Sequence, residues 1–162
     1  LDKMEEEIQN YEAQNKTGNT VLDTLLTTKG LYCLKHKISL TSVVEGKLLE
    51  FMDVMDICSI FGNALDNAIH AVKSLDAGIE KYICVSGRIQ GDFLMMEIEN
   101  SFQGKGAFKK GTGLSNVKKA AEKYGGAMSI ETPENKFVLH VLLIISQHPE
   151  GIPQQMTKTD RS

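Results

Sequence analysis

Hydrophobic residues recur at helical spacing most clearly over residues 51–72. The apolar positions follow one another at intervals of four and three: Val54, Cys58, Phe61, Leu65, Ala68 and Val72. At 100° per residue, four polar or ionisable residues fall on the opposite face: Asp56, Asn63, Asn67 and His70. This segment is therefore predicted to form a long helix with one buried and one polar face.

Two further helices are predicted on either side of it. Residues 21–35 show apolar helical spacing, and Asn19 or Thr20 is a suitable N-cap. Residues 114–124 form the other helix, which Gly125-Gly126 ends.

Five short segments carry the alternation or the apolar runs of strands. They are residues 38–44, 82–89, 93–99, 127–131 and 137–145. Turn residues join the second strand to the third and the fourth to the fifth, which indicates two hairpins. The expected fold class is α+β, a two-layer sandwich in which helices cover one face of a mixed, mostly antiparallel sheet. A doubly wound parallel sheet is disfavoured.

Composition narrows the function classes. The chain has 162 residues, of which 41% are hydrophobic and 24% charged, and its formal net charge is −3. This balance is that of a soluble globular domain and gives no reason to expect nucleic acid or an anionic membrane as the main partner. No run of 18 apolar residues occurs, and the three cysteines lie far apart, as thiols do in a reducing compartment.

Two asparagines sit in the middle of the strongest predicted helix. Asn63 and Asn67 are four residues apart, so their amides lie one turn above each other. A carboxamide oxygen is a hard, neutral ligand that suits Mg²⁺ holding phosphate oxygens. A solvated polar face is the alternative, although asparagine is a poor helix former and two of them need a reason.

A glycine-rich stretch precedes the helix at residues 114–124. Residues 100–113 contain four glycines and three lysines, and the free N–H groups of the following helix can bind an anion. The residues that suit a phosphate are Lys109, Lys110, Gly111, Thr112, Gly113, Leu114 and Ser115. The pattern is neither a phosphate loop nor a dinucleotide turn, and a flexible surface loop remains the alternative. Just before it, Glu97 to Ser101 place polar side chains at the end of a strand.

Taken in order, these features resemble the ATPase superfamily of gyrase, the heat-shock chaperone, histidine kinases and mismatch-repair proteins. Residues 61–69, Phe-Gly-Asn-Ala-Leu-Asp-Asn-Ala-Ile, are similar to its N box. Residues 111–117, Gly-Thr-Gly-Leu-Ser-Asn-Val, are similar to its second glycine box, and Tyr124-Gly125-Gly126 ends the helix that follows. The resemblance covers residues 21–145 and is greatest to the peptide-sensing quorum-receptor kinases. It implies the Bergerat-type ATP-binding fold.

The resemblance also implies a role for each matching residue. Asn67 would coordinate the Mg²⁺ that bridges the phosphates of ATP, and Asn63 would make a second N-box contact. The backbone of Gly111, Thr112, Gly113 and Leu114 would wrap the phosphates, with Lys109 or Lys110 as a mobile cation. His70 stands where many kinases have a basic residue near phosphate, or is a surface histidine.

The sequence departs from the superfamily at the adenine-reading box. Most members have an aspartate followed by a glycine pair, whereas this chain has Asn100-Ser101-Phe102. An asparagine oxygen still accepts a hydrogen bond from an adenine amino group, but it lacks the charge that roughly doubles the strength of such a bond. Weak nucleotide affinity is therefore expected.

In superfamily members that hydrolyse ATP, a glutamate one turn before the magnesium asparagine orients the attacking water. Asn63 occupies that position, and a carboxamide is no general base. The expected activity is transfer to a histidine on a paired dimerisation helix. None of His36, His70, His140 and His148 matches such a position, so this chain is expected to bind nucleotide without phosphorylating itself.

The expected division is a partial dimerisation helix and connection over residues 1–35, an ATP-binding catalytic domain over 36–146 and a disordered tail over 147–162. The first part is polar, with a thin apolar stripe. The whole protein would be a homodimeric, membrane-bound receptor with this domain in the cytoplasm, and a response regulator would be its partner. The alternatives are a serine kinase of the anti-sigma type and an interaction module that binds no nucleotide.

Overall fold

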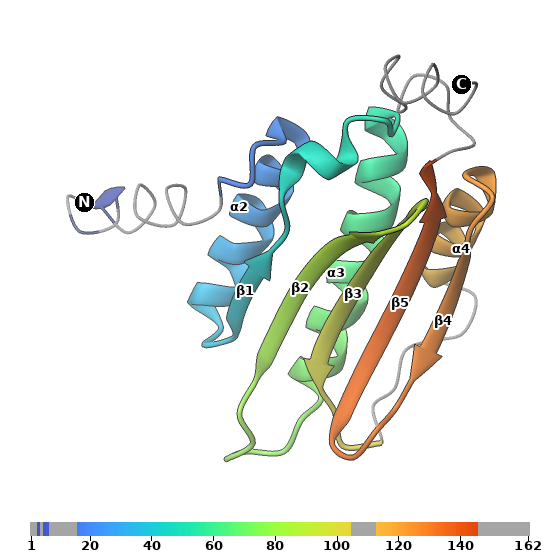
Figure 1. The fold of residues 1–162 in the computed structure, drawn as a ribbon. Helices are drawn as coiled ribbons and strands as arrows, with labels where there is room; N and C mark the ends of the chain where they lie inside the picture. Colours follow the sequence, from blue (N-terminus) through green and yellow to red (C-terminus); the bar gives the residue numbers. More distant parts are fainter. Residues whose placement is uncertain (1–2, 4, 7–15, 105–112, 146–162) are drawn as a thin grey trace, which may run out of the picture.

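The chain folds into two layers, a five-stranded sheet and a set of helices on one of its faces (Figure 1). This computed structural model describes residues 3, 5–6, 16–104 and 113–145. The elements are α2 (Thr20–Lys35), β1 (Ser39–Val43), the 3₁₀ helix η1 (Gly46–Leu49), α3 (Val54–Lys73), β2 (Tyr82–Gln90), β3 (Phe93–Ser101), α4 (Gly113–Lys123), β4 (Ala127–Glu131) and β5 (Lys136–Ile144). Within those described ranges, no helix is long and apolar enough to cross a membrane.

The strands lie in the order β1-β2-β3-β5-β4. Strands β1 and β2 are parallel, so the chain must cross over between them, and α3 is the helix of that crossover. The other neighbouring pairs are antiparallel, and β2–β3 and β4–β5 are hairpins. The predicted α+β sandwich with a mixed, mostly antiparallel sheet is confirmed.

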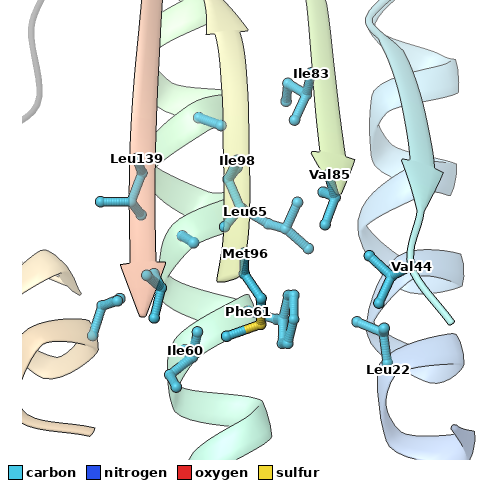
Figure 2. Packing of buried hydrophobic residues seen from close by; sticks show 14 of the residues in the cluster. Leu22, Val44, Ile60, Phe61, Leu65, Ile83, Val85, Met96, Ile98 and Leu139 are labelled. Atoms are coloured by element: carbon cyan, nitrogen blue, oxygen red, sulfur yellow. The ribbon is translucent and has the colours of Figure 1, made fainter. Parts of the chain in front are cut away.

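The core lies between the sheet and α3. Figure 2 shows Phe61 and Leu65 of α3 against Met96 and Ile98 of β3, and all four side chains are buried. Neighbouring strands add buried residues to the same layer: Ile83, Val85 and Leu139. Apolar residues four apart on α3 face apolar residues two apart on β3. Because one side of α3 is buried along its length in this way, residues 51–72 have the clearest hydrophobic pattern in the sequence.

Helix α2 is part of the same core. Leu22, Leu26 and Cys33 are fully buried and belong to the cluster that contains the α3 residues. The N-terminus of α2 is capped by Asn19, whose Oδ1 accepts a hydrogen bond of 3.0 Å from the Leu22 N–H, as one of the two predicted N-caps. The role of residues 1–35 in dimerisation stays a prediction.

The helix predicted to begin at residue 51 begins three residues later. Gly46–Leu49 forms a 3₁₀ turn that the sequence pattern did not indicate, and buried Phe51 and Met52 follow it. Val54, expected on the apolar face, is 53% exposed because it is the first residue of α3. The buried side of the helix starts one turn later, at Ile57.

The face of the sheet opposite the helices carries polar side chains. The Tyr82 hydroxyl donates a hydrogen bond of 2.7 Å to Glu99 Oε2. On the next strand pair, His140 Nδ1 lies 3.3 Å from Glu97 Oε2. Among the described residues no helix covers this face (Figure 1), so these strands alternate between core and polar positions.

The C-terminal end of α4 is fixed by two glycines, as predicted from Tyr124-Gly125-Gly126. Gly125 has a left-handed φ of 71°, and the Gly126 N–H closes the helix on the carbonyl of Ala121 at 2.9 Å. Gly126 also passes so close to β5 that a Cβ atom would lie 1.6 Å from the carbonyl oxygen of Leu142. Only glycine fits there.

Replacing Gly126 by alanine is expected to lower the free energy of unfolding by about 3 kcal/mol or more, because α4 and β5 would have to separate. Gly62→Ala is the matched control, because a Cβ atom on this helical glycine meets no atom within 4 Å. That change is expected to stabilise the domain by about 0.5 to 1 kcal/mol. Urea denaturation followed by circular dichroism measures both. Equal stabilities for the two variants would contradict the close packing at Gly126.

Candidate functional site

The two N-box asparagines lie on the same side of α3 and are half-buried. The Nδ2 group of Asn63 donates a hydrogen bond of 2.7 Å to the carbonyl oxygen of Ser59, one turn earlier. This bond back to the helix backbone orients the Asn63 amide and accounts for a polar residue in the middle of a long helix. Asn67 follows one turn later.

The N-terminus of α4 lies against Asn63. A Cβ atom built on Gly113 would lie 2.8 Å from Asn63 Oδ1 and 3.0 Å from Asn63 Cβ. The backbone of the first residue of α4 can approach the N-box helix this closely only because Gly113 has no side chain. The first N–H groups of a helix lack intrahelical partners and attract anions, so this approach brings a helix end that can attract an anion beside Asn63.

Asn100 is a buried polar residue near the end of β3, and its side chain is 1% exposed. By strand alternation it shares the helix-facing side of β3 with Leu94, Met96 and Ile98. Its Nδ2 group donates a hydrogen bond of 2.8 Å to the carbonyl oxygen of Ser101. Its Oδ1 atom is buried and has no hydrogen-bond partner in the part of the chain that the structure describes.

An unpaired buried acceptor is costly, by about 1 to 3 kcal/mol, and is rare in proteins unless something else satisfies it. The bond to Ser101 fixes the amide so that the nitrogen is used and the oxygen is left for a donor. Asn100 is therefore set up to accept a hydrogen bond, as its sequence position suggested.

The match between β3 and α3 indicates where Asn100 lies along the helix. In Figure 2, Met96 lies by Phe61 and Ile98 by Leu65, so two residues along β3 match four along α3. The rises of a strand and a helix give the same match, about 6 to 7 Å for each step. Continued by one step, this match sets Asn100 at the level of Ile69, two residues beyond Asn67. The structure thus brings Gly113 against Asn63, with Asn67 one turn later on the same side of α3 and Asn100 on the helix-facing side of β3.

The other predicted site residues are placed differently or lie outside the described residues. Leu114 is 6% exposed and packs in the core, so only its backbone is available to a ligand. Lys109, Lys110, Gly111 and Thr112 lie outside the described residues.

His70 lines a groove of about 520 Å³ between α2 and α3, together with Thr28, Lys29, Tyr32, Asp66, Ile69 and Lys73. An ion pair joins the two helices across this groove, because Lys29 Nζ of α2 lies 2.6 Å from Asp66 Oδ1 of α3. The placement of His70 fits a surface histidine as well as a phosphate contact, and its role remains a prediction.

The sequence did not reveal a polar cluster that joins α3 to the end of α4. The Tyr124 hydroxyl donates a hydrogen bond of 2.6 Å to Asp56 Oδ2 and accepts one of 2.9 Å from the Asp53 N–H. Lys123 Nζ donates to the same Asp56 oxygen at 2.9 Å. Asp56 was assigned to the polar face of the helix, but its side chain is only 13% exposed because α4 covers it. In the sequence, the available signal for this cluster was that Asp56 lies seven residues, or two helical turns, before Asn63 and so on the same side of the helix.

The cluster raises the pKa of two of its residues, Tyr124 and Lys123. Burial and then the hydrogen bond to Asp56 raise the pKa of Tyr124 to about 12. The hydrogen bond to Asp56, followed by the attraction of its charge, raises the pKa of Lys123. Both shifts mean that the neutral phenol and the charged ammonium are the forms that hold α4 to α3.

The fold and the site define a domain of the ATPase superfamily that the sequence resembles, and the comparisons identify the family. The sequence model of the GHKL domain matches residues 52–144, more than half of the chain. The chain belongs to this family. A comparison with curated proteins finds no match.

Solved structures with the same fold include histidine kinase domains. The catalytic domain of histidine kinase ThkA, in a nucleotide-free form, has a TM-score of 0.61 at 18% identity, over 76% of this chain and 90% of that one. Histidine kinase AdeS of Acinetobacter baumannii has a TM-score of 0.59 at 14% identity, over 76% of this chain and 62% of that one. The blue-light activated kinase EL346 of Erythrobacter litoralis gives 0.59 at 11% identity, with 79% and 62% covered. At these identities the likeness shows the fold.

Tyr124→Phe is expected to show how the cluster depends on pH. A folded-state pKa of about 12, above the ordinary 10, means that the hydroxyl stabilises the fold fully below pH 10 and ceases to do so as the pH rises towards 12. The wild type should exceed the variant in unfolding free energy by about 1 to 2 kcal/mol at pH 8, and the difference should shrink above pH 10. Urea denaturation between pH 8 and 11.5 tests this. A difference that stays constant would contradict the assignment.

Proposed function

We propose that this chain is the ATP-binding catalytic domain of a two-component sensor histidine kinase. The observation that carries the proposal is the close approach of the N-terminus of α4 to Asn63 of the N box. The buried acceptor of Asn100, which has no partner among the described residues, supports it from the strand that packs against the same helix. These groups come from segments far apart in the chain, and each has a counterpart in the order of motifs that suggested nucleotide binding.

The adenine end of the nucleotide would be read by Asn100. Its buried Oδ1 lacks a partner among the described residues, and an exocyclic amino group is a donor that fits it. Because the Nδ2 group is held by Ser101, the amide cannot turn to read a carbonyl without breaking that bond. This supports adenine over bases that carry an oxygen at the same position.

The phosphate end would lie between Asn67 and the start of α4. Asn67 would hold Mg²⁺, with Asn63 beside it, and the backbone of Gly113 with Lys109, Lys110, Gly111 and Thr112 would surround the phosphates. The bound ion would neutralise charge on the phosphate oxygens. The close approach of Gly113 to Asn63 supports this arrangement, since a side chain at that position would occupy the space between the two helices.

Phosphoryl transfer fits the side chains better than hydrolysis. Asn63 is held by Ser59 at the position where a water-activating carboxylate would be needed, and a carboxamide takes up no proton at neutral pH. The role of this domain would be to hold and orient the γ-phosphate for an incoming histidine. That histidine would come from the dimerisation helix of a homodimeric receptor kinase of the peptide-sensing type, with a response regulator as the next acceptor.

Asn67→Ala is expected to abolish the effect of Mg²⁺ on ADP binding. In isothermal titration, the wild type should bind ADP more tightly with Mg²⁺ than with a chelator. With Mg²⁺ present, the variant should bind ADP at least about tenfold more weakly than the wild type, because it has lost a contact to a charged group. Asp66→Ala is the control, because that carboxylate points to Lys29 of α2. No wild-type binding at millimolar ADP would contradict the proposal and favour an interaction module.

Asn100→Ala is expected to remove discrimination between adenine and hypoxanthine. The wild type should prefer ADP over inosine diphosphate, which carries a carbonyl oxygen in place of the amino group. Losing one hydrogen bond should weaken ADP binding about fivefold and leave inosine diphosphate within twofold. Competition titrations with both nucleotides measure the ratio. A variant that keeps the wild-type preference would show that Asn100 does not read the base.

A further inference from the structure

Helix α4 is attached to α3 at both of its ends. At its N-terminus, Gly113 lies against Asn63. At its C-terminus, Lys123 and Tyr124 bind Asp56 and the backbone of Asp53, at the start of α3. The first attachment belongs to the proposed nucleotide site. The second lies at the opposite end of α4 and has no part in it.

The attachment through Tyr124 is well defined. The ring is 2% exposed and packs edge-on against Phe51, with 5.7 Å between the ring centroids. The hydroxyl both donates and accepts, to a carboxylate and from a backbone N–H at the start of α3. A buried tyrosine hydroxyl usually finds a hydrogen-bond partner, and here both of its partners belong to the start of α3, so the contact ties α4 to that helix end.

The same residue is also fixed to the sheet. The Tyr124 carbonyl oxygen accepts a hydrogen bond of 3.2 Å from the Ile144 N–H of β5. The C-terminal end of α4 is therefore held by α3 on one side and by β5 on the other. These contacts set the direction of the α4 axis at its C-terminal end.

The direction of the α4 axis at its C-terminal end determines where its N-terminal end lies. Helix α4 has 11 residues, so it is about 16 Å long, and a tilt of about 4° at Tyr124 moves Gly113 by about 1 Å. A displacement of that size between groups that hold one ligand is enough to change binding or rate up to about a hundredfold.

We propose that Tyr124, through Asp56, is a positioning residue that sets the distance between the N-terminus of α4 and the N-box asparagines, and thereby the affinity for the phosphates of the nucleotide. The inference rests on the proposed function. It assigns a task to the tyrosine that ends the glycine-box helix, a residue that touches no part of the nucleotide in this scheme. Lys123, bound to the same carboxylate oxygen, supports Tyr124 in this task.

Tyr124→Phe tests the proposal when ADP and adenosine are compared. Adenosine lacks phosphates, so a misplaced α4 should weaken ADP with Mg²⁺ about five- to tenfold and leave adenosine within twofold. The ratio of the two dissociation constants separates positioning from stability, because partial unfolding weakens both ligands equally. Isothermal titration at 15 °C, with the folded fraction checked by circular dichroism, provides the ratio.

Tyr82→Phe is the matched control. It removes a tyrosine–carboxylate hydrogen bond of 2.7 Å on the opposite face of the sheet, so it should leave the ratio unchanged. Lys123→Met is the second variant, because this half-exposed side chain can be replaced with little effect on folding, and it should change the ratio two- to threefold. Lys119→Met, an exposed lysine on the same helix, controls for the lost charge.

The outcomes distinguish this inference from the proposed function. A wild type that binds ADP and a Tyr124→Phe variant with the wild-type ratio would overturn the positioning role alone. A wild type that binds neither ligand would overturn the proposed function, and the positioning role with it. Equal loss of ADP and adenosine affinity would show that Tyr124 only stabilises the fold.

Discussion

The domain depends on the two-sided character of α3. One side of this helix is buried against the sheet through Phe61, Leu65 and Ala68, and this burial of apolar area is the main force that holds the layers together. The polar groups that suggest function lie on the remaining surface of the same helix. The helix that carries the two asparagines also buries more residues than α2 or α4, and site residues on a rigid element keep their spacing.

Helix α4 packs beside the surface of α3 that does not face the sheet. It buries Leu114, Val117 and Ala121 in the shared core, but its direction is set by polar contacts at its C-terminus and by the absence of a side chain at Gly113. Apolar packing alone tolerates small shifts of one helix along another, because it has no directional preference. Hydrogen bonds to Asp56 and to the Asp53 backbone supply the direction, since they weaken steeply when the angle changes.

The sequence predicted every strand and every helix within the described ranges except η1, and it located the asparagines, because hydrophobic period and motif order are local properties. The helix beginning at Val54 was placed too early, since the apolar Phe51 and Met52 that precede it are buried by tertiary contacts without being helical. The sequence also did not predict which element packs beside each polar residue of this helix. Asp56 and His70 looked equivalent on the helical projection, yet α4 covers the first and the groove beside α2 takes the second. Nor did the sequence say that the Nδ2 group of Asn100 would be used by Ser101, which decides what Asn100 can accept.

The lengths of the strands have a consequence for association between molecules. The three inner strands, β2, β3 and β5, have nine residues each, whereas the edge strands β1 and β4 have five each. An exposed edge offers unpaired backbone groups to a strand of another molecule, and a short edge offers few of them. Strand β1 exposes Ser39, Thr41 and also Val43, which is 71% exposed, and β4 exposes Ser129 and Glu131. The short length of the edges is therefore what limits pairing. The domain thus offers few edge groups for growth of its sheet, and crowding many copies together would not by itself lead them to join strand to strand.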